Sequence, residues 1–294
     1  FTIGSFEVKW YGIIIAAGFA LALVYGYLNA ARLGLNIDRV LDVVLVATPV
    51  AILGARTYYV IFDGEPIESV AEFFGFNGSG ISGLAIYGGV IGAVLSGFIM
   101  AKIRKVNILD LLDLASVAFL IGQGIGRWGN FFNQEAFGGP TGSSWGGMTS
   151  ENVVYDFRIQ GFEIDALAHP CFLYESIWCL TGAVVLHILS RKRKFSGETA
   201  LMYCVWYGFG RSIIETMRTD SLMLGNAKVS FLLSLLLCLG AIAALILINK
   251  KIKTKAKQTE YVDMFKDEIA AEVNTEDIVE EAIEIEDTTE NTEE

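Results

Sequence analysis

Charged residues are scarce in this sequence: only 19% of its 294 residues are Asp, Glu, Lys or Arg, whereas 53% are hydrophobic. Soluble domains average about 25% charged residues, so this chain has too little polar surface to remain soluble. Its mean hydropathy is +0.49. The composition therefore excludes a soluble enzyme, a secreted disulfide scaffold and a nucleic-acid-binding protein.

Cysteine and histidine are also few, with four and two residues. Cys171, Cys179, Cys204 and Cys238 lie in or beside apolar runs and show neither metal-like spacing nor a pairing pattern. We expect them to be buried free thiols that pack as small apolar residues. Because His and Cys are too scattered to form a metal site, we expect no metal or redox cofactor.

Acidic residues are concentrated at the C-terminus. Residues 260–294 contain 15 acids and one Lys, so the rest of the chain carries a net charge of +3 although the whole chain carries −11. We predict a membrane domain over residues 1–250 and a tail over residues 251–294 that is first basic and then acidic. The acidic part is polar enough to be solvated and disordered.

Seven apolar runs have room for the roughly 20 residues that cross a bilayer. Each must be a helix, because lipid cannot satisfy an open backbone and the runs lack the alternation of a β-barrel. We therefore predict an all-α polytopic membrane protein with seven transmembrane helices. The first run has no basic segment ahead of it, so we expect a span and not a cleaved signal peptide. The predicted spans are Trp10–Ala31, Val40–Phe62, Ile81–Ala101, Ile108–Ile125, Cys171–Ser190, Thr199–Ile214 and Val229–Asn249.

Basic residues orient these spans, because Lys and Arg collect on the cytoplasmic side of a membrane. One side receives Arg32, Arg39 and, after the last span, five Lys residues. The opposite side receives an acidic loop from Asp63 to Glu72 that contains no Lys or Arg. We expect a multi-pass protein of a cell membrane whose N-terminus is extracytoplasmic and whose C-terminus is cytoplasmic.

One loop on the outer side, residues 126–170, is long. Its first half is rich in Gly and Ser, and its second half alternates apolar residues at Val153, Tyr155, Phe157 and Ile159. Alternation of this kind is typical of a strand. The pattern predicts a small extracytoplasmic cap with a short hairpin.

Polar side chains inside the predicted spans gather at their outer ends, although such groups are costly in a bilayer unless they are paired. Tyr207, Arg211 and Glu215 are spaced i, i+4 and i+8 and so share one stripe of a helix. Asp110 and Asp113 lie near the inner ends, where we expect structural roles. The outer group also includes Tyr11, Arg56, Tyr87, Arg127, His169 and Glu175.

Three arginines at one depth suggest a binding pocket. Arg makes forked contacts with phosphate oxygens, so a pocket lined by Arg in the outer leaflet would suit an anionic phospholipid headgroup. An ion-pair network that only clamps the helices together is the alternative. For a single pair such as Arg211 and Glu215, that alternative explains the residues equally well.

The densest polar segment is residues 126–138, Gly-Arg-Trp-Gly-Asn-Phe-Phe-Asn-Gln-Glu-Ala-Phe-Gly. It resembles the motif R-x-G-N-F-x-N-x-E-x-x-G of the prolipoprotein diacylglyceryl transferases and matches all seven specified positions. Further segments resemble the same family in the same order, over about residues 8–248. They are Trp10-Tyr11-Gly12, Gly54-Ala55-Arg56, Tyr87-Gly88-Gly89, His169-Pro170 with Tyr174-Glu175, and Tyr207-Gly208 with Arg211, Glu215 and Arg218.

The resemblance implies an enzyme of the bacterial cell membrane. Such enzymes move the diacylglyceryl group of phosphatidylglycerol onto the lipobox cysteine thiol of a preprolipoprotein, which forms a thioether and releases glycerol phosphate. The resemblance implies that Arg127 and Arg211 stabilise the leaving phosphate and that Asn130 and Glu135 orient them. It implies substrate-binding roles for Tyr11, Arg56, Asn133, Gly138, His169, Tyr207 and Glu215.

The group that takes the thiol proton is left open by the sequence. Many members of the family have His where this chain has Tyr87, and a free Tyr has a pKa of about 10, far from that of a good base near pH 7. Either Tyr87 is only a hydrogen-bond partner, or the arginines lower its pKa, or His169 or Glu135 accepts the proton. Positive potential alone raises the thiolate fraction of a Cys whose pKa is about 8.5.

Two other functions fit part of the sequence. An anion transporter or channel would also need an arginine cluster, but the charges gather in one leaflet, and neither paired half-helices nor an inverted repeat is visible. A membrane scaffold that recruits partners through its acidic tail would depend on residues 258–294.

Overall fold

The structure is a computed structural model of the chain, and it describes residues 2–3, 6–7, 9–63, 69, 73, 83, 85–219, 221, 223–224, 227–256 and 258–259. The chain forms two compact units, residues 1–241 and 242–294. The stretch that the sequence predicts to be acidic and disordered, residues 260–294, lies outside the described residues. The candidate site lies in the first unit.

Most of the described chain is helical. Among the described residues, six helices are long and apolar enough to cross a membrane, which confirms an all-α polytopic membrane protein. The sixth predicted span, Thr199–Ile214, lies in α8 (Glu198–Met217), which is less apolar because it carries Arg211 and Glu215. The six apolar helices are α1 (Trp10–Asn29), α2 (Ile37–Asp63), α4 (Ile86–Ile103), α5 (Ile108–Phe132), α7 (Cys171–Ser190) and a helix over Val229–Ala256.

Short elements connect or precede these helices. A 3₁₀ turn joins α1 to α2 and ends at Gly34, whose φ of +72° favours glycine. The strands of the described chain form two small antiparallel hairpins. These elements are β1 (Thr2–Ile3) with β2 (Phe6–Glu7), β3 (Met223–Leu224) with β4 (Ala227–Lys228), and η1 (Ala31–Leu33).

Large apolar side chains cover the outside of the helices. Leu28, Leu45 and Leu236 are 71%, 71% and 68% exposed, and many Ile, Val and Phe side chains are also exposed. In water, apolar surface costs about 25 cal/mol for each Å² exposed. These exposed apolar side chains therefore face lipid.

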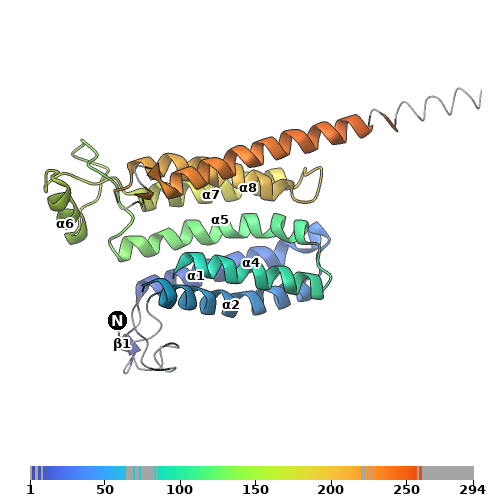
Figure 1. Ribbon diagram of the computed structural model, residues 1–294, viewed down its shortest axis with the longest axis horizontal. Coiled ribbons are helices and arrows are strands. Elements are labelled where there is room, and N and C mark those ends of the chain that lie inside the picture. Colours follow the sequence, from blue (N-terminus) through green and yellow to red (C-terminus); the bar gives the residue numbers. More distant parts are fainter. Residues whose placement is uncertain are drawn as a thin grey trace, which may run out of the picture. The chain divides into compact units, whose positions relative to one another are not determined.

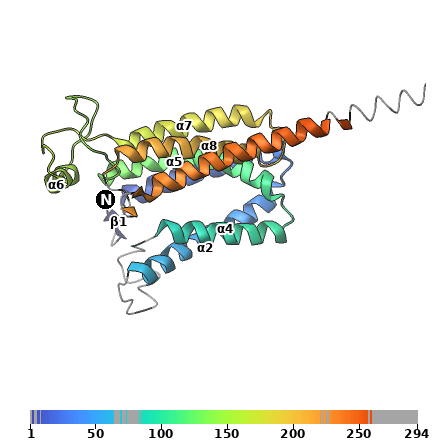
Figure 2. The ribbon, with the colours of Figure 1, turned by 45° about the horizontal axis from the view of Figure 1, so that its top comes forward.

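The helices pack in pairs through glycine. The α2 helix packs against α4, α1 packs against α5, and α5 packs against α7 and α8 (Figure 1; Figure 2). A Cβ atom added at Gly88 would lie 2.2 Å from the carbonyl oxygen of Gly54. One added at Gly18 would lie 3.1 Å from the carbonyl oxygen of Gly122. Glycine therefore sets the close approach within the α2–α4 and α1–α5 pairs.

One end of the bundle, where α5 and α8 end and α7 begins, is called the cap end. At the opposite end, Asp113 of α5 accepts hydrogen bonds from the backbone N–H groups of Gly197 (2.9 Å) and Ala200 (2.8 Å). Arg193 donates to Asp113 at 2.7 Å and to Asp110 at 2.5 Å. Burial alone would lower the pKa of Arg193, but its hydrogen bonds to the two carboxylates raise that pKa above its ordinary value. Asp113 thus caps α8 from a neighbouring helix.

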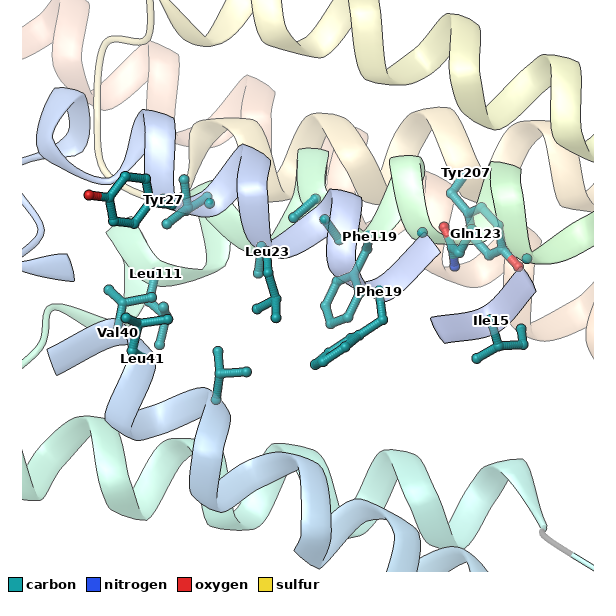
Figure 3. Close-up of a pocket in the computed structure, with 18 of the residues that line it drawn as sticks. Ile15, Phe19, Leu23, Tyr27, Val40, Leu41, Leu111, Phe119, Gln123 and Tyr207 are labelled. Atoms are coloured by element: carbon teal, nitrogen blue, oxygen red, sulfur yellow. The ribbon is translucent and has the colours of Figure 1, made fainter. Parts of the chain in front are cut away.

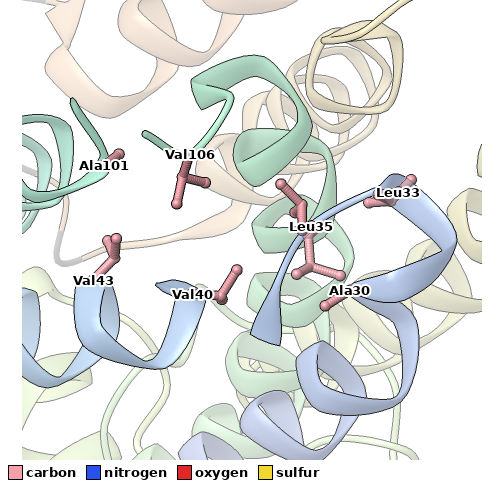
Figure 4. Close-up of a cluster of buried hydrophobic side chains, with 8 residues drawn as sticks. Ala30, Leu33, Leu35, Val40, Val43, Ala101 and Val106 are labelled. Carbon is pink, nitrogen blue, oxygen red and sulfur yellow. The ribbon is translucent and has the colours of Figure 1, made fainter. Parts of the chain in front are cut away.

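At the same end as Asp113, opposite the cap end, a cluster of buried apolar side chains joins three chain segments (Figure 4). They come from the segment after α1 with η1, from the start of α2, and from the end of α4, the turn after it and the first turns of α5. The buried members include Ala30, Leu33, Leu35, Val40, Val43, Ala101, Val106 and Leu114.

The hairpin predicted for the cap is wrong, because this segment forms a helix, α6 (Glu151–Gln160). Ser150 caps the helix by accepting the backbone N–H of Val153 at 3.2 Å. Val153 and Phe157 are one helical turn apart and fully buried, whereas Tyr155 is 67% exposed. Apolar residues at every second position fit a strand, but two of them four residues apart also define the buried face of a helix.

Candidate functional site

One buried carboxylate, Glu175 in the first turns of α7, is the centre of a cluster of three arginines at the cap end. Arg127 Nη2 lies 2.5 Å from Glu175 Oε2. Arg211 Nη1 contacts Oε1 of the same carboxylate, and Arg218 Nη1 lies 3.7 Å from it. The Glu175 side chain is only 3% exposed. The sequence expectation that Arg127, Arg211 and Glu175 meet across three helices is therefore matched by the contacts.

A second carboxylate on α8, Glu215, and a lysine on β4, Lys228, complete this cluster. Arg211 Nη2 lies 2.6 Å from Glu215 Oε2, one turn further along the helix. Lys228 Nζ donates to the carbonyl oxygens of Glu215 at 2.8 Å and Arg218 at 2.6 Å. These carbonyls form the negative end of the helix dipole, which a cation stabilises.

The guanidinium groups of three arginines, Arg127, Arg211 and Arg218, lie around Glu175, and Arg211 also contacts Glu215. Each guanidinium group has five N–H donors in a fixed fork, which suits the oxygens of a phosphate. The ion pairs also hold the guanidinium groups in place before any ligand binds.

The turn after α5 presents the amide groups of the motif. Arg127 Nη1 donates to Asn130 Oδ1 at 3.5 Å, a long contact. Asn130 and Asn133 each donate a side-chain N–H to Glu135 Oε1, at 2.9 and 3.2 Å. The left-handed φ of Gln134, +54°, helps to fold the chain back so that these groups meet. Arg127, Asn130, Asn133 and Glu135 thus form one connected set.

Gly138 joins this turn to the end of α8. Its backbone N–H donates to the carbonyl oxygen of His169 at 2.9 Å, and it forms a bridge with Arg218. A Cβ atom at Gly138 would lie 2.5 Å from the carbonyl oxygen of Met217, so no other residue fits. The ring of His169 lies against Tyr174, with Nδ1 3.3 Å from the hydroxyl. The motif glycine therefore holds the chain segment that carries Arg218.

A cavity of about 630 Å³ leads from this cluster along α1, α2 and α5. Its polar end is lined by Tyr11, Arg127, Asn130 and Tyr207, and most of the remaining wall is apolar. Figure 3 draws Gln123 and Tyr207 at one end and Tyr27, Val40, Leu41 and Leu111 at the other. A cationic head followed by a long apolar channel is the shape complement of an anionic lipid.

Comparison with known proteins decides the family. A family model described as prolipoprotein diacylglyceryl transferase matches residues 1–247. The chain belongs to the prolipoprotein diacylglyceryl transferase family. Membership makes it a transferase and a multi-pass membrane protein. The comparisons lend no support to an anion transporter.

Curated members of the family match almost the whole chain. One from Clostridium perfringens, a phosphatidylglycerol–prolipoprotein diacylglyceryl transferase 1, is 44% identical over 259 residues, 87% of this chain and 96% of its own. Phosphatidylglycerol–prolipoprotein diacylglyceryl transferases from Bacillus licheniformis and Clostridioides difficile are 45% and 37% identical. These matches cover 83% and 88% of this chain and 89% and 98% of the relatives.

Two residues of the transferase that the sequence placed in the outer group lie on the α2–α4 pair. Arg56 donates to the carbonyl oxygens of Phe73 and Gly83, both at 3.3 Å. The ring of Tyr87 lies 6.3 Å from that of Tyr58, and its side chain is 44% exposed. Both therefore lie on the α2–α4 pair, whereas α5, α7 and α8 carry Arg127, Glu175 and Arg211.

Sequence reasoning missed two residues of this transferase. Lys228 is a lone Lys in a short loop and gives no pattern, although a cation after the end of a helix is a known capping signal. Gln123 stands four residues before Arg127, so helical spacing places both on one face of α5. This spacing could have indicated that Gln123 lies near the same site as Arg127.

Among the described residues, no group of three or more His, Cys, Asp or Glu residues is placed to hold a metal ion. The cysteines are free thiols, as predicted. Cys171, Cys179 and Cys238 are buried, and Cys204 is half-buried.

Proposed function

We propose that this protein transfers the diacylglyceryl group of phosphatidylglycerol to the lipobox cysteine thiol of a preprolipoprotein in the bacterial cell membrane. The observation that carries the proposal is the arginine cluster at the head of an apolar cavity. The curated relatives, which this chain matches over most of their length, are named for the same lipid and protein substrates.

In this reaction the thiolate sulfur attacks the glycerol carbon that bears the phosphate. A carbon–sulfur bond forms, the carbon–oxygen bond to phosphate breaks, and its electron pair leaves with glycerol phosphate. Negative charge therefore grows on the leaving oxygen. Arg127 and Arg211 are fixed in advance by Glu175, so they stabilise that charge without reorganising.

The thiol proton needs an acceptor, and we assign Glu135. Its carboxylate accepts hydrogen bonds from Asn130 and Asn133, which hold it beside the phosphate-binding Arg127. Glu135 is exposed, so an incoming peptide can reach it. Tyr87 lies on the other helix pair and the His169 ring lies against Tyr174, so both are assigned to substrate binding.

The proposed topology places the cap end outside the cytoplasm. The opposite end carries Arg32, Arg104 and the Arg191–Lys194 run, which fits the bias of Lys and Arg toward the cytoplasm. The N-terminus would then be extracytoplasmic and the C-terminus cytoplasmic. Residues 1–250 form the catalytic domain in this proposal, and residues 251–294 form a cytoplasmic tail.

The direct test uses the full chain, purified in detergent with phosphatidylglycerol and a peptide that carries a lipobox cysteine. We expect the peptide to gain the mass of a diacylglyceryl group and glycerol phosphate to appear in equal amount. A peptide with Ser in place of Cys and a mixture with phosphatidylethanolamine as the sole lipid are the controls. No modified peptide, or equal product with the Ser peptide, would overturn the proposal.

A further inference from the structure

Gln123 is a polar side chain on the wall of an otherwise mainly apolar part of the cavity. It lies one helical turn before Arg127 on α5, and both residues line the cavity. One turn of helix displaces it by about 6 Å along the axis, away from the cap end. A polar group at this depth in a membrane protein is costly unless something pairs with it.

Tyr203 of α8 holds the Gln123 amide in place. Gln123 Nε2 lies 3.1 Å from the Tyr203 hydroxyl, which lies 3.3 Å from Gln123 Oε1. The ring of Tyr203 stacks on that of Tyr207, with centroids 5.7 Å apart and planes within 2°. Arg127 and Tyr207 line the polar end of the cavity, and the hydrogen-bonded Gln123 and Tyr203 lie one helical turn deeper.

The hydrogen bonds to Tyr203 leave one N–H group of the Gln123 amide without a partner among the described residues. A side-chain amide has two N–H groups, and the Tyr203 hydroxyl can accept at most one of them. Within the described part of the chain, the side-chain hydrogen bonds of Gln123 are those to Tyr203. The second N–H is therefore available to a hydrogen-bond acceptor that enters the cavity.

The chemistry of a phosphoglyceride supplies such an acceptor. Its ester carbonyl oxygens are the next polar groups after the phosphate, separated from it by the glycerol backbone alone. A lipid whose phosphate lies on Arg127 brings an ester carbonyl to the depth of Gln123, while its acyl chains continue along Phe119 and Leu23.

We propose that Gln123, positioned by Tyr203, donates a hydrogen bond to an ester carbonyl of the lipid donor. It thereby makes the enzyme selective for ester-linked over ether-linked glycerol lipids. The inference rests on the proposed function, which supplies the phosphate at Arg127. An ether lipid lacks the carbonyl oxygen, so it leaves the amide unpaired.

The test compares two donors of equal chain length, diacyl phosphatidylglycerol and its dialkyl ether analogue, in kcat/KM with one lipobox peptide. We expect the unaltered enzyme to favour the ester lipid about tenfold or more. Gln123→Leu should lose rate with the ester lipid and little with the ether lipid, so the preference collapses. Phe119→Leu, an apolar change in the same wall, should keep the ester preference whatever its effect on the overall rate.

The outcomes separate this inference from the proposed function. If neither lipid gives product with the unaltered enzyme, the proposed function fails. An ester preference in Gln123→Leu equal to that of the unaltered enzyme overturns the role of Gln123 alone. Should Gln123→Leu be inactive with both lipids, Tyr203→Phe carries the test, because it leaves the amide in place but unanchored. It should weaken the preference, and an unchanged preference overturns the proposal.

Discussion

Trp178 of α7 and Trp206 of α8 each donate their indole N–H to the other's backbone carbonyl oxygen, at 2.9 and 3.0 Å. Their rings stack with centroids 4.5 Å apart. Room for the indoles comes from the glycines that face them, Gly182 and Gly210. Trp178 lies about one helical turn from Glu175. These two hydrogen bonds between the tryptophans, called the tryptophan clasp below, therefore fix how α7 and α8 align along their length, and that alignment brings Glu175 and Arg211 together.

Filling one of these glycine spaces should disturb that register. A Cβ atom at Gly210 would lie 2.1 Å from Trp178 Nε1, so Gly210→Ala forces the indole out of its place. We expect a loss of about 1–3 kcal/mol in the free energy of unfolding. Transferase activity should fall with it. Thermal unfolding in detergent measures the first effect.

Gly240→Ala is the matched control, because nothing lies within 4 Å of a Cβ atom at Gly240. It should leave both unfolding and activity unchanged. Equal behaviour of the two variants would contradict the account of the clasp.

Arg211 contacts two carboxylates through the two arms of its guanidinium group, and a lysine has no such fork. Its Nη1 contacts Glu175 and its Nη2 contacts Glu215, so Arg211→Lys keeps the charge but loses one arm of the fork. We expect kcat to fall about 10²- to 10³-fold, as for the loss of a transition-state donor. Release of glycerol phosphate is the measurement.

Arg104→Lys serves as the control for this charge-preserving change, because Arg104 pairs with Asp42 at the opposite end of the bundle and is half-exposed. Near-normal turnover of Arg211→Lys would show that point charge suffices and that the forked geometry has no role.

Glu175 stabilises the fold as well as the site. Glu175→Gln removes the charge that Arg127 and Arg211 share and leaves buried guanidinium groups uncompensated. Breaking a buried pair in this way costs about 3–5 kcal/mol. Glu135→Gln, at an exposed carboxylate, should lower activity with little change in unfolding. Chemical denaturation followed by tryptophan fluorescence measures the free energy of unfolding of the two variants. Equal values for Glu175→Gln and Glu135→Gln would contradict a stabilising role for Glu175.

Lys228 positions the end of α8. Lys228→Met removes the donor to the carbonyl oxygens of Glu215 and Arg218, so we expect the free energy of unfolding to fall by about 1 kcal/mol and KM for the lipid to rise. Lys228→Arg retains the cation and should restore KM. If Lys228→Arg were as impaired as Lys228→Met, charge at this position would not be the cause.

Deleting residues 258–294 should leave transferase activity intact, because the cavity and the arginine cluster lie in residues 11–228. The measurement is peptide modification by the shortened chain in the same detergent. Loss of activity would instead favour a protein that works through its acidic tail.

The sequence predicts the helices and the ion cluster well, because both avoid a large free-energy penalty inside the membrane. Lipid forces long apolar runs to be helices, and the cost of burying charge drives Arg127, Glu175 and Arg211 together. What the sequence does not resolve are weaker preferences. The alternation at Val153 and Phe157 fits a strand or a helix, and Ser150 decides the matter as a cap.

Positions fixed by packing are also beyond prediction from one sequence. The separation of Tyr87 and Arg56 from the cluster depends on how the α2–α4 pair packs, which the spacing along each helix does not specify. Gln123 and Tyr203 are ordinary residues until two helices bring them within 3.1 Å of each other.

Glu175 engages Nη2 of Arg127 and Nη1 of Arg211, and a guanidinium group has five N–H donors. In the proposed reaction each arginine therefore keeps donors for the leaving phosphate while it remains paired with the carboxylate. The negative charge of Glu175 offsets part of the positive charge that glycerol phosphate would meet. Product release from such a site is expected to be faster than release from arginines that have no internal anion beside them.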